Sequence, residues 1–186
     1  MPYQWQKQAY FMGTLKKHLP VKLVIGFIFK DTKVYAKAKS VLKIRFGLID
    51  FESQILDFVH TDYYEKEFGK KLKRGFVSFQ KLISPDELSA IKITTNKIEV
   101  RLSHQKLRRI NIDPGYLDLS KLVLATTKDY KHRIYLSQGI WAEVTLFYQG
   151  NTFRPWEWTY PDYQTEAYTN IFNSIRKIYV EQVKKT

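Results

Sequence analysis

The segment from Thr126 to Arg133 holds the densest group of chemically active side chains in the sequence. It supplies hydroxyls, a lysine, a carboxylate, an imidazole and a guanidinium. Lys128 and Arg133 are residue types that hold phosphate or carboxylate groups, and Thr127 adds a hydroxyl to a ligand-binding set. Histidine is a residue type that can act as an acid or a base near neutral pH, so His132 is the leading candidate for proton transfer. The alternative interpretation is a solvated loop.

Two other segments place polar side chains where they could join this group. Asn111 and Asp113 alternate with isoleucines, so in a strand they would point away from the apolar face. Glu143 alternates with apolar residues in a later segment. If these strands share a sheet, Asn111, Asp113, Arg133 and Glu143 lie on one polar face. Asp113 and Glu143 are then candidate catalytic residues together with His132, and Asn111 is a candidate ligand-binding residue.

The turn at Ser137-Gln138-Gly139 decides whether Arg133 meets Glu143. A three-residue loop pairs apolar residues with each other and sets Arg133 opposite Glu143, so it is favoured over a two-residue loop at Gln138-Gly139. The predicted pairs are Leu136 with Ile140 and Ile134 with Ala142. The predicted apolar face carries Ile134, Leu136, Ile140, Ala142, Val144 and Leu146; the polar face carries Arg133, Tyr135, Trp141, Glu143 and Thr145. A plain cross-strand ion pair is the alternative interpretation of Arg133 and Glu143.

The segment from residue 61 to residue 69, TDYYEKEFG, follows a predicted strand and is a second candidate site. Asp62 and Glu67 could bind a hard cation such as Mg²⁺ through their oxygens. Tyr63 and Tyr64 are candidate ligand-binding residues, because loops at strand ends often carry binding side chains. Alternatively, Asp62 caps a helical turn and the tyrosines pack in the core.

The overall charge points to a different class of partner. The chain has 31 basic and 18 acidic residues, for a net charge of +13, which favours anionic partners. The candidate phosphate contacts for RNA or DNA are Lys70, Lys71, Lys73, Arg74, Lys106, Arg108 and Arg109. The alternative interpretation is a lysine-rich surface that aids solubility. The sequence contains no GxGxxG, no phosphate-binding loop and no HExxH.

Length and composition are those of an ordinary globular protein. The 186 residues are 44% hydrophobic and 26% charged, which suits a single domain over residues 21–186 preceded by an arm over residues 1–20. There is no cysteine, which excludes disulfides and fits a reducing compartment. No segment has the length of an apolar signal or membrane span, so we expect a cytoplasmic protein.

Hydrophobic patterning predicts the elements of the first half. Residues 21–29 are almost continuously apolar, which is typical of a central strand. A helix is expected from Asp31 to Gly47, followed by strands over residues 48–58 and 75–82. Ser84-Pro85-Asp86-Glu87 is a capping box that begins another helix, although the alternating apolar residues of 91–102 also fit a strand.

In the second half, residues 109–113 read as a strand that ends in a turn at Pro114-Gly115. Residues 119–127 fit either a short helix or a strand. Two linked hairpins are expected over residues 133–136, 140–148 and 153–155, and a last helix over residues 164–183. This order predicts an α+β fold, with a ferredoxin-like β-α-β-β-α-β core extended by C-terminal β-hairpins and a C-terminal helix. A different α+β sandwich is the alternative.

Several short motifs in order resemble an uncharacterised protein family, domain of unknown function 4416. The similar motifs are PVKLVIG at 20–26, TDYYEKEFG at 61–69, KRGFVSF at 73–79, NIDPGY at 111–116, KLVLATTKD at 121–129, HRIYL at 132–136, AEVTLFY at 142–148 and TYPDY at 159–163. The resemblance runs from about residue 20 to the C-terminus. It implies no catalytic role for any residue, and it emphasises polar motifs over the lysine excess.

Three classes of function follow. The first is a protein that binds a small anionic ligand, either a nucleotide or another metabolite bearing phosphate or carboxylate, on the polar sheet face, with Mg²⁺ as a candidate cation. The second is an RNA- or DNA-binding module that uses the basic surface. The third is a structural protein that oligomerises through its aromatic residues, which make up 16% of the chain.

Overall fold

The computed structural model describes residues 14–59, 64–105 and 107–185. In this part of the chain, nine strands form one antiparallel sheet. The strands are β1 (Val21–Phe29), β2 (Ile49–Glu52), β3 (Leu56–Phe58), β4 (Leu72–Ile83), β5 (Ile110–Leu117), β6 (Lys121–Thr126), β7 (Ile134–Ser137), β8 (Ile140–Gln149) and β9 (Thr152–Pro155). The helices are α1 (Thr32–Phe46), α2 (Glu65–Phe68), α3 (Leu88–Leu102) and α4 (Glu166–Val183), with 3₁₀ helices η1 (Pro85–Glu87) and η2 (Pro161–Gln164).

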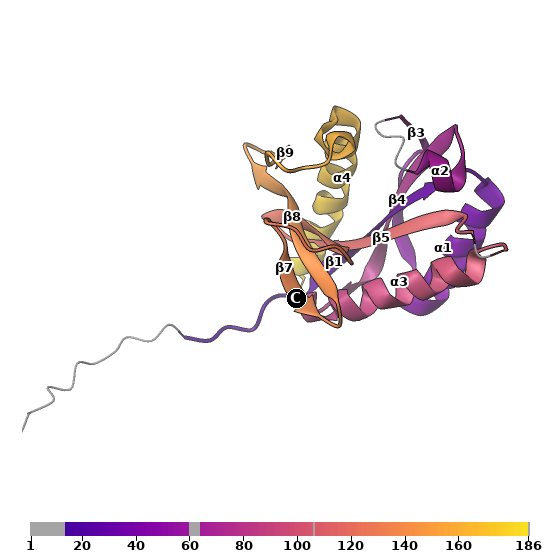
Figure 1. Ribbon diagram of the computed structural model, residues 1–186. Helices are drawn as coiled ribbons and strands as arrows, with labels where there is room; N and C mark the ends of the chain where they lie inside the picture. The colour runs from indigo at the N-terminus through magenta and orange to yellow at the C-terminus, as the bar shows by residue number, and fades with distance from the viewer. Residues whose placement is uncertain (1–13, 60–63, 106, 186) are drawn as a thin grey trace, which may run out of the picture.

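The strand order along the sheet is β2-β4-β1-β5-β6-β8-β7, with β3 beside β4 and β9 beside β8. Helices α1 and α3 lie on one side of the sheet and α4 lies on the other (Figure 1). The predicted α+β class, the two C-terminal hairpins and the C-terminal helix are therefore confirmed. None of the helices in the described ranges is long and apolar enough to cross a membrane.

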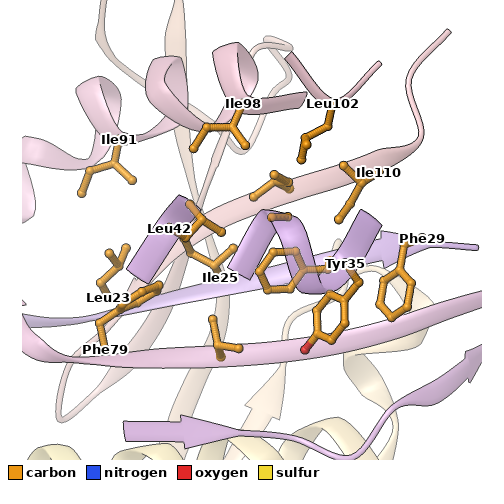
Figure 2. Close-up of a cluster of buried hydrophobic side chains, with 14 of the residues drawn as sticks. Leu23, Ile25, Phe29, Tyr35, Leu42, Phe79, Ile91, Ile98, Leu102 and Ile110 are labelled. Carbon is orange, nitrogen blue, oxygen red and sulfur yellow. The ribbon is translucent and has the colours of Figure 1, made fainter. Parts of the chain in front are cut away.

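Strand β1 is buried along its whole length, as its apolar sequence predicts. Its odd-numbered side chains, such as Leu23 and Ile25, pack beneath α1 and α3 (Figure 2). Val24 faces the opposite side and packs in the cluster that α4 covers. A strand covered on both faces must be apolar on both faces, which explains the missing alternation.

The two long helices on the first face begin at the predicted caps. The Asp31 carboxylate accepts a hydrogen bond from the Lys33 N–H at 2.8 Å. The Glu87 carboxylate accepts one from the Ser84 N–H at 2.8 Å, which begins η1 and then α3. Residues 91–102 are thus helical and the strand alternative is wrong, because one face of the helix already accommodates the buried apolar residues. Those residues are Leu88, Ile91, Ile98 and Leu102.

The predicted strand over residues 48–58 consists of two short strands, β2 and β3. Both pair with β4, and Ser53 interrupts the ladder between them. The Ser53 N–H donates to the Phe76 carbonyl at 2.9 Å, and the Ser53 hydroxyl accepts from the Phe76 N–H at 3.0 Å. The interruption therefore leaves no backbone group of Phe76 unpaired.

The predicted turn at Pro114-Gly115 is wrong, because β5 runs straight through both residues. The strand pairs with β1 from Ile110 to Leu117, whereas β6 pairs with only its last three residues. A Cβ atom at Gly115 would lie 2.3 Å from the Val123 carbonyl oxygen, so only glycine lets β6 approach this closely. Pro114 has no N–H to donate, and the ladder between β5 and β6 ends beside it. The two strands separate from this point.

Residues 119–127, which fitted either a helix or a strand, form the turn into β6 and the strand itself. The buried Asp118 carboxylate holds this turn together. It accepts hydrogen bonds from the backbone N–H groups of Ser120 at 2.7 Å and Lys121 at 2.8 Å, and from the Lys121 ammonium at 2.6 Å. Burial alone would raise the pKa of Asp118, but these hydrogen bonds outweigh burial and lower the pKa.

We predict that Asp118→Ala destabilises the protein by about 2 kcal/mol at pH 7, because buried donors lose their acceptor. A carboxyl with a lowered folded-state pKa stabilises above its unfolded value, near 3.8, and loses that contribution as the pH falls through the folded value. Urea unfolding should therefore show the full difference at pH 7 and a smaller one at pH 3. An equal difference at both pH values would contradict the assignment. Asp129→Ala, at an exposed position, is the control.

The β7–β8 turn differs from the favoured three-residue loop. Gln138 and Gly139 have φ values of 54° and 75°, so they form a two-residue turn that pairs Ser137 with Ile140. A register shift at Leu136 then restores the predicted pair between Ile134 and Ala142. The predicted pair between Leu136 and Ile140 is wrong, because a bulge at Leu136 leaves Ser137 opposite Ile140.

The predicted apolar face of this hairpin is also only partly correct. Ile134 and Leu136 are 69% and 39% exposed. On β8, Val144 packs in the α3 cluster, whereas Leu146 packs in the α4 cluster. A second register shift between β6 and β8, at Thr145, exchanges the faces. The continuous apolar face is therefore divided between the two sides of the sheet.

Candidate functional site

A cavity of about 740 Å³ lies where β5 and β6 separate. Helix α3 and β5 line it on one side, and the end of β6, the residues that follow it and η2 line it on the other. Six of the predicted catalytic and ligand-binding residues line this cavity: Tyr64, Asn111, Asp113, Thr127, Lys128 and Glu143. The structure thus brings Asp113 and Glu143, from strands 30 residues apart, to one space.

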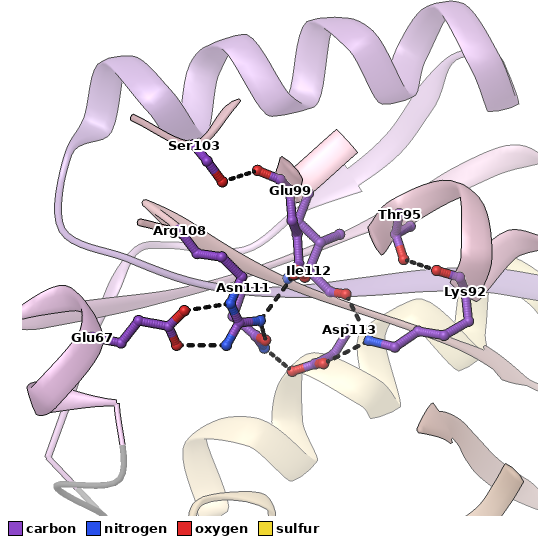
Figure 3. A network of polar contacts seen from close by, with 9 residues as sticks. All are labelled: Glu67, Lys92, Thr95, Glu99, Ser103, Arg108, Asn111, Ile112 and Asp113. Carbon is purple, nitrogen blue, oxygen red and sulfur yellow. Dashed lines mark hydrogen bonds and ion pairs between the residues drawn. The ribbon is translucent and has the colours of Figure 1, made fainter. Parts of the chain in front are cut away.

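Helix α3 supplies hydrogen-bond partners to the edge of β5 that β6 leaves unpaired. The Glu99 carboxylate accepts a hydrogen bond from the Ile112 N–H at 2.6 Å, and the Lys92 ammonium donates to the Ile112 carbonyl at 3.1 Å (Figure 3). Lys92 also donates to Asp113 at 3.3 Å. Burial raises the pKa of Glu99. Two ionisable side chains therefore replace the missing strand partner and keep the cavity open.

We predict that Glu99→Ala destabilises the protein by about 2 kcal/mol, because a buried N–H loses its acceptor. The Ile112 amide should exchange its hydrogen faster than in the wild type, which NMR can follow at this single residue. Lys97→Ala, at an exposed position of the same helix, should change neither property. If the Ile112 amide stayed protected in the Glu99 variant, the proposed role of Glu99 at the strand edge would be wrong.

Glu67, the predicted Mg²⁺ ligand, forms an ion pair with an arginine. Both of its carboxylate oxygens accept from Arg108, at 2.5 and 2.6 Å, and Arg108 also donates to Glu99 at 2.9 Å and Asn111 at 3.3 Å (Figure 3). The hydrogen bonds to Glu67 raise the pKa of Arg108. A carboxylate held at both oxygens is not a free metal ligand, which argues against this prediction for Glu67.

The other predicted residues of this segment, Asp62 and Tyr63, lie outside the described residues. Across the described ranges, no three histidine or acidic side chains are placed together so that they could hold a metal ion. Tyr64 lines the cavity, and burial raises the pKa of its phenol, so it is a neutral hydroxyl group at physiological pH.

Arg74 lines the same cavity from β4, and sequence reasoning placed it instead on a nucleic-acid-binding surface. That prediction is wrong for Arg74, because the residue is 1% exposed. Its guanidinium donates to the Tyr163 hydroxyl at 2.5 Å. The nearest carboxylates, Asp113 and Asp162, are both 3.9 Å away, beyond hydrogen-bond distance. Its Nε–H is buried and has no hydrogen-bond partner within residues 14–59, 64–105 and 107–185.

Aromatic rings hold this guanidinium in place. Its carbon lies 4.7 Å from the centre of the Phe76 ring and 5.1 Å from that of Tyr163, and the rings of Tyr168 and Phe58 are within 6.0 Å. Burial would lower the pKa of Arg74, but the charges around it outweigh burial and raise the pKa. A Cβ atom at Gly26 would lie 3.2 Å from the guanidinium, so glycine leaves room for it. Arg74 is therefore a fixed, permanent cation at the cavity wall.

Glu143 is 2% exposed and is held by two residues singled out in the sequence. Arg133 donates to its carboxylate at 3.0 Å, and the His132 Nε2 lies 3.1 Å from the same oxygen. The predicted contact between Arg133 and Glu143 is confirmed. Neither Arg133 nor His132 lines the cavity itself. Their role in the geometry is to fix the carboxylate that does.

Two aromatic residues support this group. The His132 ring stacks on Trp158 at 5.3 Å, and its buried Nδ1 has no hydrogen-bond partner among the residues that the structure describes. Arg133 also donates to the Tyr160 hydroxyl at 2.6 Å and to the Lys128 carbonyl at 3.0 Å. Burial raises the pKa of Tyr160, which lines the cavity as a neutral phenol. Arg133 therefore donates to Glu143, Tyr160 and Lys128, and its role in ligand binding stays a prediction.

Several other basic residues of the predicted nucleic-acid surface have acidic partners. Lys73 pairs with Asp57, and Arg109 pairs with Asp31. Lys70 and Lys71 are exposed, and Lys106 lies outside the described residues. Binding of RNA or DNA stays a prediction.

Sequence reasoning missed the cavity residues Lys92, Glu99 and Asp162 and misassigned Arg74. A signal for Arg74 was present, since it alternates with Leu72 and Phe76, which are both buried. A basic residue in register with buried apolar residues is a candidate for a buried cation. No comparable signal marked Asp162, which lies just before the predicted last helix.

The fold and the site together define an α+β protein with a large antiparallel sheet and a polar cavity between two separating strands. The chain belongs to the family described as Domain of unknown function (DUF4416), whose model matches residues 19–179. The family resemblance of the short motifs is confirmed. No curated protein and no solved structure matches the chain.

Proposed function

We propose that this protein binds a small anionic ligand in the cavity between β5 and β6, with Arg74 as the residue that receives the anionic group. The observation that carries the proposal is the state of Arg74. It is a buried cation on a cavity wall. Among the described residues, no carboxylate lies at hydrogen-bond distance from it and no acceptor pairs with its Nε–H. Buried guanidinium groups are stable when their donors are paired, and a planar carboxylate or a phosphate fits that fork.

The remaining residues of the cavity support a polar ligand. Asn111, Thr127, Lys128 and Tyr64 supply donors and acceptors on its walls. We propose Asp113 and Glu143 as the carboxylates that would contact the ligand and, if a reaction takes place, transfer its protons. His132 contacts Glu143 and not the cavity, so we assign it a positioning role. The geometry at Glu67 gives no support to Mg²⁺ as a cofactor.

We also propose that β1, α1, β2, β4, α3 and β5 form a ferredoxin-like core. The strand order β2-β4-β1-β5, with both helices on one face, supports this assignment. The C-terminal extension then begins at β6, and the cavity lies between the edge strand of the core and that extension. On this view, the ligand site was created by the addition of β6 to β9.

The test is a thermal-shift screen with amino acids, their deaminated carboxylic acids and phosphomonoesters that include nucleoside monophosphates, each with and without Mg²⁺. We expect at least one class to raise the unfolding temperature of the wild type, since a ligand at 100 times its Kd adds about 2.7 kcal/mol. No stabilisation by any class would contradict the proposal.

The effect should depend on Arg74. Arg74→Lys keeps the charge beside Asp113 and Asp162 but loses the forked donors, so we expect affinity to fall about tenfold or more. Arg109→Lys is the matched control, because Arg109 is half exposed and does not line the cavity. Stabilisation that survives unchanged in a folded Arg74→Lys variant would place the ligand elsewhere.

A further inference from the structure

We infer that the ligand is a zwitterion, in which the anionic group is a carboxylate and an ammonium group lies close to it, as in an amino acid. This inference rests on the proposed function and specifies the chemical class of its ligand. It is carried by the charges that surround Arg74.

Nearby carboxylates already balance the positive charge at Arg74. Asp113 and Asp162 both lie 3.9 Å from the guanidinium, and Lys92 pairs with Asp113 at 3.3 Å, so two cations face two carboxylates. A phosphate monoester would add close to two further negative charges at this point. Such a group would be repelled by both aspartates at short range in a buried setting. A carboxylate adds one charge only, and its planar geometry matches the guanidinium fork.

The cavity as a whole has no excess of positive charge. Four basic side chains and four acidic side chains line it, so their formal charges cancel. They are Arg74, Lys92, Arg108 and Lys128, and Glu99, Asp113, Glu143 and Asp162. Sites that hold phosphate commonly add backbone N–H groups at a helix N-terminus. Here the first residue of η2 at the cavity is Pro161, which has no N–H, and the next is the acidic Asp162.

We assign Asp162 as the acceptor for the ammonium group of the ligand. Its side chain is 10% exposed, and its closest cationic partner in the described part of the chain is Arg74, at 3.9 Å. By contrast, Asp113 accepts from Asn111 at 2.5 Å, and Glu143 is held by Arg133. A buried carboxylate without a hydrogen-bonded cation favours a ligand that brings one. The ammonium group of an amino acid bound to Arg74 would meet this need.

The part of the cavity wall that would contact the rest of the ligand contains both apolar and polar side chains. Ile28, Phe58 and Leu124 give the cavity an apolar part, whereas Asn96 and Thr126 are polar. A volume of about 740 Å³ exceeds what the smallest amino acids fill. We therefore expect amino acids with larger side chains, or larger molecules that contain an amino acid group, to bind more tightly than glycine.

The experiment compares ligands that differ in one group. Each of the common amino acids is paired with its deaminated acid, its decarboxylated amine and a phosphomonoester of similar size, and thermal shifts give the apparent affinities. We expect an amino acid to bind at least about tenfold more tightly than its deaminated acid, since a hydrogen bond to a charged group is lost in the latter. We expect phosphomonoesters and amines to give no shift.

The variant Asp162→Asn should remove the preference for the amino acid over the deaminated acid. Asp129→Asn, at an exposed position, should leave that preference unchanged. Phosphomonoesters that stabilise the wild type but not Arg74→Lys would overturn the zwitterion and leave the anion site standing. An amino acid preference that persists in Asp162→Asn would overturn the role of Asp162. If no member of the panel bound, both the inference and the proposed function would fail.

Discussion

Gly115→Ala should be among the most damaging single methyl additions to this protein, with a loss of about 3 kcal/mol or more in the free energy of unfolding. The added Cβ would lie 2.3 Å from the Val123 carbonyl oxygen and 2.7 Å from the Leu124 side chain. Because the first contact is with backbone, it cannot be relieved by a side-chain rotation. The expected result is separation of β5 from β6 along the residues that still pair. Chemical denaturation of the purified variant measures the loss.

The control for this prediction is Gly139→Ala. Gly139 has a φ of +75° and open space around its Cα, so only backbone strain opposes a side chain there. We expect a loss of about 1 kcal/mol at that position. If Gly115→Ala were as mild as Gly139→Ala, then β6 would not approach β5 as described, and the shape assigned to the cavity would be wrong.

Arg74→Met should produce the second large effect. The substitution removes a buried cation and leaves Asp113 and Asp162 beside an apolar side chain. Removing one partner of a buried ion pair costs about 3–5 kcal/mol, much of it from the charge left behind. The distances of 3.9 Å suggest the lower part of that range for Arg74.

A double substitution separates this cause from lost packing. Arg74→Met with Asp162→Asn removes one of the uncompensated charges, so the double variant should be more stable than Arg74→Met alone. Urea unfolding of the wild type, the two single variants and the double variant gives the coupling energy. If the two substitutions were simply additive, the charge of Asp162 would have no part in the environment of Arg74.

Elements with a long periodic pattern could be predicted from the sequence. Strand β1 is apolar apart from Lys22, and α4 carries an apolar stripe of Tyr168, Ile171, Phe172, Ile175 and Tyr179, all buried. Such patterns are local, and each residue adds to the same conclusion. The Pro114-Gly115 pair has no such redundancy, because its sequence fits a turn and a strand edge equally well. The position of Val123, eight residues further on, decides between them.

In the candidate site too, local features could be predicted from the sequence, whereas contacts between distant segments could not. Asn111, Asp113 and Glu143 could be assigned to one polar face because alternation fixes which side of a strand each occupies. The partners of these residues could not be predicted, since they come from distant segments. Glu67 meets Arg108 across 41 residues, and Arg74 meets Tyr163 across 89. Nothing local in the sequence distinguishes a carboxylate that binds a metal from one that an arginine occupies.

The most direct test of the anion site is the NMR signal of the Arg74 side chain in the wild type. Its Nε–H is buried and pairs with no acceptor in the part of the chain that the structure describes, so its ¹H–¹⁵N resonance reports on any group that arrives beside it. The protein is titrated with 2-aminobutyrate and, separately, with butyrate and inorganic phosphate, and Arg74→Lys assigns the resonance. We predict that the resonance moves to saturation with 2-aminobutyrate, and more weakly with butyrate. A resonance that stays unchanged with all three probes, and with every compound that stabilises the protein, would contradict the assignment of Arg74 as the anion receptor.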